Sequence, residues 1–130
     1  MPAQILTKRW NQPAENRDGT RIFVARYRPR YLRKGEEPWS EWRKELAPSR
    51  ELHAAWFGKA GAKIGAQITF EEYARRYHQE MAGQDQAIGD LARRLMNGET
   101  ITLLCYCADA TRCHRSLLKS MIESIATQEG

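Results

Sequence analysis

The sequence contains little cysteine and no long apolar run. Three of its 130 residues are cysteines, and two of the three are separated by a single residue. An odd number with this spacing is not the pattern of a disulfide framework, and it favours the reducing cytoplasm. No apolar segment approaches the roughly 20 residues of a membrane-spanning helix, and the first ten residues lack the apolar core of a signal peptide. We therefore expect a cytoplasmic protein with no membrane partner.

Repeats and low-complexity tracts are also absent, which favours an ordinary globular chain. Hydrophobic residues make up 42% and charged residues 28% of the sequence, and a length of 130 residues predicts one domain over residues 1–130. Lysine and arginine outnumber aspartate and glutamate by 21 to 16, for a net charge of +5. This excess favours a small anionic ligand or a nucleic acid as partner, although many proteins of such charge bind neither. The composition carries no prediction of oligomeric state.

Short strands are predicted near both ends of the chain. Residues 4–8 and 21–27 contain β-favouring side chains and are separated by a polar stretch with an Asp-Gly turn pair. Residues 100–105 form a nearly continuous apolar run, which is typical of a buried central strand.

Helices are predicted between and after these strands. Pro38, followed by Trp39, Trp42 and Leu46 at helical spacing, predicts one helix. Further helices are expected to begin at the caps Ser49, Thr69 and Asp85, the last with Met96 on its buried face, and a final helix covers residues 117–125. This order predicts a sheet with helices packed on it.

The turn from the buried strand into the last helix, residues 105–116, is the strongest candidate site. Ligands of α/β sheets bind beyond the carboxyl ends of the strands, and the first turn of a helix offers unpaired N–H groups and a positive dipole end. A small anion, such as a nucleotide or phosphate group, is therefore expected here. We expect it to contact Arg112, His114, Arg115 and Ser116. Alternatively, the arginines are solvated and Thr111 merely caps the helix.

The cysteines of this turn have several interpretations. A thiolate at Cys113 would be stabilised by the helix dipole and flanking cations, as a nucleophile or redox sensor requires; alternatively, Cys113 is a small buried side chain. If the protein is an enzyme, Cys113 or Cys107 is the expected nucleophile and Asp109 or His114 the expected proton carrier.

A soft-metal site is another interpretation of the same residues. Side chains two positions apart on a strand point to the same face, so Cys105 and Cys107 share one face. Cys113 and His114 follow in the sequence. The spacing lacks the paired C-x2-C knuckles of common zinc sites, so no metal and no cofactor is predicted, and a redox or metal sensor built on the three cysteines stays an alternative. Six residues after Cys107 stands Cys113, so a phosphatase-like C-x5-R loop is absent.

The basic segment of residues 26–34 interleaves cations with two tyrosines. If residues 21–27 run parallel to residues 100–105, then Arg26, Arg28 and Arg30 are expected to reach the same anion from the opposite side. Two alternatives stay open. The segment binds nucleic acid by arginine–phosphate contacts and tyrosine stacking, or its arginines pair with nearby glutamates.

Several segments together carry a family resemblance. They are Trp-Arg-Lys-Glu-Leu-Ala-Pro-Ser-Arg-Glu-Leu at 42–52, Trp-Phe-Gly at 56–58, Phe-Glu-Glu-Tyr at 70–73, Arg-Arg-Tyr at 75–77, Leu-Leu-Cys at 103–105 and Cys-His-Arg-Ser at 113–116. Over residues 18–125 the chain resembles the bacterial domain of unknown function 488 (DUF488), and especially its YeaO-like branch.

The resemblance implies a bacterial cytosolic α/β domain of small three-layer, Rossmann-like type, with a short, mostly parallel sheet flanked by helices. It implies no established activity. The branch tends to place an Asp-Arg pair after its strand, where this chain has Ala25-Arg26. An activity that depends on that aspartate is therefore not implied for this chain.

Overall fold

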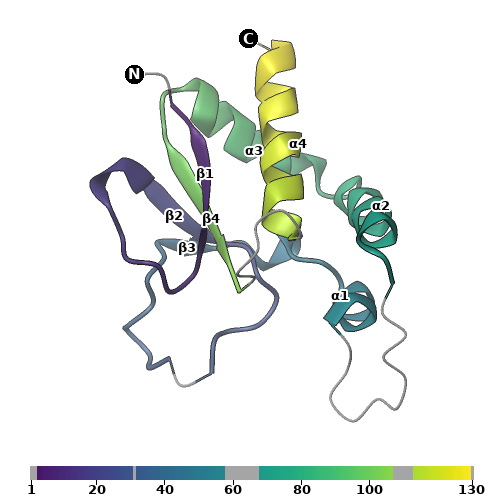
Figure 1. Cartoon of the computed structure of the whole chain (residues 1–130). Coiled ribbons are helices and arrows are strands. Elements are labelled where there is room, and N and C mark those ends of the chain that lie inside the picture. Colours follow the sequence, from purple (N-terminus) through teal and green to yellow (C-terminus); the bar gives the residue numbers. More distant parts are fainter. Residues whose placement is uncertain (1–2, 31, 58–67, 107–112, 130) are drawn as a thin grey trace.

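The computed structural model describes residues 3–30, 32–57, 68–106 and 113–129. Three strands lie in the first part of the chain, three α-helices follow, and the strand β4 and the helix α4 come last (Figure 1). Their bounds are β1 Ile5–Arg9, η1 Asn16–Asp18, β2 Thr20–Phe23, β3 Glu41–Trp42, η2 Lys44–Leu46, α1 Arg50–Phe57, α2 Phe70–Met81, α3 Asp85–Met96, β4 Ile101–Cys105 and α4 His114–Glu129.

The strands form one four-stranded sheet in the order β1-β4-β2-β3, and every neighbouring pair is parallel. Ile101 of β4 is opposite both Ile5 of β1 and Thr20 of β2. The fold is therefore α/β with a parallel sheet, as expected. Because β2 and β4 run in the same direction, the segments that follow Phe23 and Cys105 leave the same edge of the sheet.

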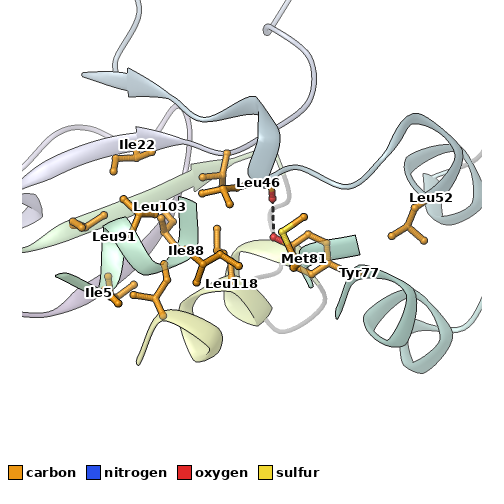
Figure 2. Close-up of a cluster of buried hydrophobic side chains, with 14 of the residues drawn as sticks. Ile5, Ile22, Leu46, Leu52, Tyr77, Met81, Ile88, Leu91, Leu103 and Leu118 are labelled. Atoms are coloured by element: carbon orange, nitrogen blue, oxygen red, sulfur yellow. Dashed lines mark hydrogen bonds between the residues drawn. The ribbon is translucent and has the colours of Figure 1, made fainter. Parts of the chain in front are cut away.

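Helices cover one face of this sheet. In Figure 1 the helix α4 runs alongside β1 and β4, with α3 packed against it. Figure 2 shows apolar side chains of the two layers meeting, among them Leu103 from β4 and Leu118 from α4, both fully buried. At one end of this cluster the Tyr77 hydroxyl donates a hydrogen bond of 2.7 Å to the carbonyl oxygen of Leu46. Burial of these side chains is the main contribution to stability.

The sheet is the middle layer of three. On the face opposite the helices lie the segments that flank β2. Phe23 is stacked on Trp39 with ring centroids 4.2 Å apart, and it also contacts Trp42. Further along this face Asp18 is buried and forms ion pairs with Lys8 at 2.9 Å and Arg21 at 3.2 Å. The ion pairs of Asp18 hold the connection between β1 and β2 against the sheet.

Several predicted boundaries are confirmed. The Ser49 hydroxyl accepts a hydrogen bond of 3.1 Å from the N–H of Leu52 and so caps α1, and Thr69 caps α2 in the same way. All five residues of β4 are buried, as expected of a central strand. The last helix buries Leu118 and Ile122 as predicted.

Other predictions were wrong. The segment after Pro38 forms no α-helix: Trp42 belongs to the edge strand β3, its indole Nε1 donates to the Ala25 carbonyl oxygen at 2.7 Å, and only the short 3-10 helix η2 follows. The helical spacing of Trp39, Trp42 and Leu46 led to a wrong prediction, because the two tryptophan side chains pack beside β2 instead. Met96 is 40% exposed rather than buried, because it lies at the final turn of α3. Asp85 is the first residue of α3 and not its cap.

The strand predicted over residues 21–27 ends at Phe23, although the N–H of Val24 still donates to the Leu104 carbonyl oxygen at 2.9 Å. Among the described residues, no helix combines the length and the apolar composition that crossing a membrane requires.

Candidate functional site

The candidate site lies where β4 ends and α4 begins. Cys105 is the last residue of β4, and Cys113 directly precedes the first residue of α4. Their Sγ atoms are 2.8 Å apart, and both side chains are 1% exposed. Because the parallel sheet directs the end of β4 toward the start of α4, two cysteines eight positions apart come into direct contact.

A buried cation accompanies this pair. Arg115 lies in the first turn of α4, and its Nη1 donates a hydrogen bond of 2.9 Å to Cys105 Sγ. The Arg115 side chain is 3% exposed. A guanidinium this close stabilises negative charge on the sulfur, and burial strengthens the interaction because little water screens it. Cys105 is therefore the sulfur best placed to carry a thiolate charge.

His114 lies on the other side of the cysteine pair. Its Nε2 donates a hydrogen bond of 2.8 Å to the carbonyl oxygen of Val24. Because a carbonyl only accepts, Nε2 carries the proton, and Nδ1 presents a lone pair in the neutral ring. Nδ1 lies 3.8 Å from Cys113 Sγ. Complete burial lowers the pKa of His114, which favours this neutral form.

Two further side chains border the cluster. The ring of Tyr77 lies 5.6 Å from that of His114, and burial raises the pKa of Tyr77 well above its ordinary value. His53 of α1 is half-buried, and burial lowers its pKa.

The structure brings together some of the predicted site residues. Cys113, His114 and Arg115 lie together as described above. Ser116 is half-buried in the same turn, where its backbone N–H donates to the Cys113 carbonyl oxygen at 3.2 Å. Three others, Cys107, Asp109 and Arg112, lie outside the described residues.

The three arginines predicted to bind a ligand from the basic segment have different surroundings. Arg26 follows β2 at the carboxyl edge of the sheet and is half-buried. Arg28 forms an ion pair of 2.7 Å with Glu37 and donates to two carbonyl oxygens of its own loop. Arg30 is exposed. The expected pairing of loop arginines with glutamates thus holds for Arg28, which closes the loop on itself.

Cys105 is the residue that sequence reasoning undervalued. The sequence predicts Cys113 or Cys107 as the reactive thiol, because the helix start is the more obvious source of thiolate stabilisation. The position of Cys105 as the last residue of a buried strand that faces the Cys-His-Arg run was the available signal. Together with Cys113 and His114 it also forms a set of metal donors whose ligand atoms all lie within 4.8 Å of one another.

These features define a small α/β domain with a parallel sheet and a buried cysteine–histidine–arginine cluster at its carboxyl edge. A family model described as "Active DUF488-N3 subclade" matches residues 5–126. The chain belongs to this DUF488 family, as the resemblance implied.

Similar proteins are known from several bacteria. Uncharacterized protein YeaO of Escherichia coli (strain K12) is 31% identical over 124 residues, which cover 93% of this chain and 98% of that protein. Uncharacterized protein Rv3073c of Mycobacterium tuberculosis (strain ATCC 25618 / H37Rv) is 29% identical over 105 residues, or 81% of each chain. Uncharacterized protein Mb3100c of Mycobacterium bovis shows the same identity and coverage. No solved structure matches the chain significantly.

Proposed function

We propose that the protein performs thiol redox chemistry, with Cys105 and Cys113 cycling between a dithiol and a disulfide. The observation that carries this proposal is the 2.8 Å approach of the two sulfurs beside a buried guanidinium. A disulfide bond is about 2.05 Å long, so a small movement of either side chain suffices to form it. A cation next to one sulfur of a pair is the arrangement that activates a thiolate for attack.

The chemistry balances with a hydroperoxide as the oxidant. The Cys105 thiolate attacks the outer peroxide oxygen, the O–O bond breaks, and the departing alkoxide or hydroxide takes up a proton. This leaves Cys105 as a sulfenic acid. The sulfur of Cys113 then attacks Cys105 Sγ, the S–O bond breaks, and the oxygen leaves as water with the proton of Cys113. Two electrons pass from the sulfurs to the peroxide, and a disulfide joins Cys105 to Cys113.

The neighbouring side chains suit these two steps. Arg115 Nη1, 2.9 Å from Cys105 Sγ, stabilises the attacking thiolate. His114 Nδ1, 3.8 Å from Cys113 Sγ, is the nearest described base to the thiol that must lose its proton in the second step. Cys105 therefore acts as the attacking cysteine and Cys113 as the resolving one.

The test is oxidation of the reduced protein with hydrogen peroxide, followed by peptide mass spectrometry without reductant. We expect a Cys105–Cys113 linkage that a dithiol reductant reverses. The variants Cys105→Ser and Cys113→Ser should lose the linkage, whereas Cys107→Ser should keep it. A linkage that includes Cys107 instead, or unmodified thiols after treatment, would refute the proposal.

A second candidate function is the binding of a small anion at the same edge of the sheet. It is supported by the parallel direction of β2 and β4, which places Arg26 on the edge where Arg115 and His114 lie. Thermal unfolding with increasing inorganic phosphate tests it. We expect phosphate to stabilise the wild-type protein and to have a smaller effect on Arg26→Ala, whereas Arg17→Ala, at an exposed and distant residue, should respond as wild type does. An equal shift in all three proteins would contradict this candidate.

Nucleic-acid binding by residues 26–34 stays a prediction. Its test is the affinity for DNA or RNA as a function of salt, since phosphate contacts make that affinity fall steeply.

A further inference from the structure

We infer that the reduced cluster of Cys105, Cys113 and His114 binds a soft divalent cation of the zinc class. The three ligand atoms are the two Sγ atoms and His114 Nδ1, and all lie within 4.8 Å of one another in the interior of the protein. Two sulfurs and one imidazole nitrogen are donors that zinc prefers. A fourth, tetrahedral position would then be open to water or to a ligand.

The spacing of the donors agrees with such a site after one small change. With Zn–S bonds near 2.3 Å and Zn–N bonds near 2.0 Å, tetrahedral geometry places S and N roughly 3.5 Å apart and two sulfurs roughly 3.8 Å apart. Cys113 Sγ and His114 Nδ1 are already 3.8 Å apart. The two sulfurs, at 2.8 Å, would have to separate by about 1 Å, which small rotations of the two side chains achieve.

The orientation of His114 is the observation that favours a metal most. Metal-binding histidines usually donate their second ring N–H to a carbonyl or carboxylate, which directs the other nitrogen at the metal. Here Nε2 donates to the Val24 carbonyl oxygen at 2.8 Å. Val24 is held in turn by its own N–H, which donates to Leu104 at 2.9 Å. The sheet itself therefore directs the Nδ1 lone pair toward the sulfurs.

Arg115 is compatible with a bound cation. Two thiolates and one divalent ion sum to zero charge, so the guanidinium faces a neutral complex rather than a bare cation. Its Nη1 can keep its hydrogen bond to Cys105 Sγ, because a metal-bound thiolate still accepts N–H donors. Arg115 thus supports the ligand instead of displacing the metal.

Metal binding and disulfide formation exclude each other at this cluster. The present sulfur separation lies between the two arrangements: the sulfurs approach to form a disulfide and move apart to bind a metal. Oxidation of Cys105 and Cys113 would therefore release the metal. The inference does not rest on the proposed redox function, since a metal requires only the reduced thiols.

The test is titration of the reduced, metal-free protein with Co²⁺ under anaerobic conditions. We expect saturation at about one ion per chain, with the sulfur-to-cobalt charge-transfer bands and strong visible bands of tetrahedral coordination, and loss of these bands when Zn²⁺ is added. His114→Ala should weaken Co²⁺ binding at least tenfold, or about 1.4 kcal/mol. His78→Ala is the matched control, because His78 is an exposed histidine on α2.

A second variant keeps the test decisive if His114→Ala does not fold. In His114→Gln the side-chain amide can still donate to the Val24 carbonyl oxygen, and circular dichroism reports the fold. Equal Co²⁺ affinity in folded wild type and His114→Gln, or wild type without sulfur-to-cobalt bands, would overturn the inference.

The failure of one proposal can be told from the failure of the other. Disulfide formation in metal-free His114→Gln should still reach completion, because both cysteines remain. A protein that forms the disulfide and binds no Co²⁺ refutes the metal site alone. A protein that binds Co²⁺ through sulfur but forms no disulfide on oxidation, after the metal is removed, refutes the redox function alone.

Discussion

His114 and Val24 are 90 positions apart in the sequence, yet His114 Nε2 lies 2.8 Å from the Val24 carbonyl oxygen. This hydrogen bond joins the end of β2 to the start of α4 and defines which nitrogen of His114 faces the cysteines. It depends on the parallel order of β2 and β4, which brings their carboxyl ends to one edge of the sheet. The chemistry of the cluster therefore follows from the strand order as much as from the Cys-His-Arg run.

Arg115→Met should slow the oxidation of Cys105 by hydrogen peroxide about tenfold, because a hydrogen bond to a charged group contributes about 1.5–3 kcal/mol. Methionine keeps most of the side-chain volume and removes the charge. The measurement is the rate of free-thiol loss in a background of Cys107→Ser and Cys113→Ser. Arg93→Met, at an exposed residue of α3, is the control. An unchanged rate in folded Arg115→Met would show that the guanidinium does not activate this sulfur.

Gly19→Ala should reduce the free energy of unfolding by about 3 kcal/mol or more, since strain and steric overlap add. Gly19 has φ of +63°, and an added Cβ would lie 2.1 Å from the carbonyl oxygen of Thr100. Gly35→Ala is the control: its φ is +94°, but a Cβ there meets no atom within 4 Å. We expect about 1 kcal/mol for that variant, from backbone strain alone. Urea unfolding of both proteins provides the comparison, and similar losses would contradict the packing argument.

Asp18→Asn should destabilise the protein by about 3 kcal/mol at neutral pH, because it leaves the buried cation Arg21 without its counter-charge and leaves Lys8 paired with Glu15 alone. Burial alone would raise the pKa of Asp18, but hydrogen bonding and attraction to Lys8 outweigh it, so the pKa is lowered. The stabilisation is therefore complete above the unfolded-state pKa of about 3.9 and disappears as the pH falls through the lower folded-state value.

The measurement for Asp18 is urea unfolding of wild type and Asp18→Asn between neutral pH and about pH 3, where the difference between the two should shrink. Glu15→Gln is the control, because Glu15 shares Lys8 but is about half exposed. Its effect should be clearly smaller than that of Asp18→Asn, because solvent screens an exposed ion pair. A difference for Asp18→Asn that does not change with pH would contradict the assigned role of its charge.

Tyr77→Phe should cost about 1–2 kcal/mol, because it removes the hydroxyl that satisfies the buried carbonyl oxygen of Leu46. Tyr27→Phe is the control, because Tyr27 is 43% exposed. Thermal or urea unfolding measures both variants. Tyr77→Phe should also leave Co²⁺ binding intact, since Tyr77 is not one of the three proposed donors. A stability equal to that of wild type would show that water replaces the hydroxyl.

Short-range signals allowed some predictions and misled others. The caps at Ser49 and Thr69 were predictable because the capping oxygen and the N–H it accepts from lie three residues apart. The segment from Trp39 to Leu46 was not, because its tryptophans share helical spacing by coincidence and their packing partner, Phe23, is distant in the sequence. A pattern of spacing cannot report which surface a side chain will meet.

The amino-acid sequence by itself determined where the central strand β4 and the last helix lie, and that cysteine, histidine and arginine gather between them, since hydrophobic runs and local composition decide those features. Only the tertiary structure decided that Cys105 faces Cys113, that Arg115 contacts Cys105 Sγ, and that Val24 orients His114. Those relationships depend on strand order and direction. Strand order and direction arise from long-range backbone pairing, which leaves no periodic trace in one chain.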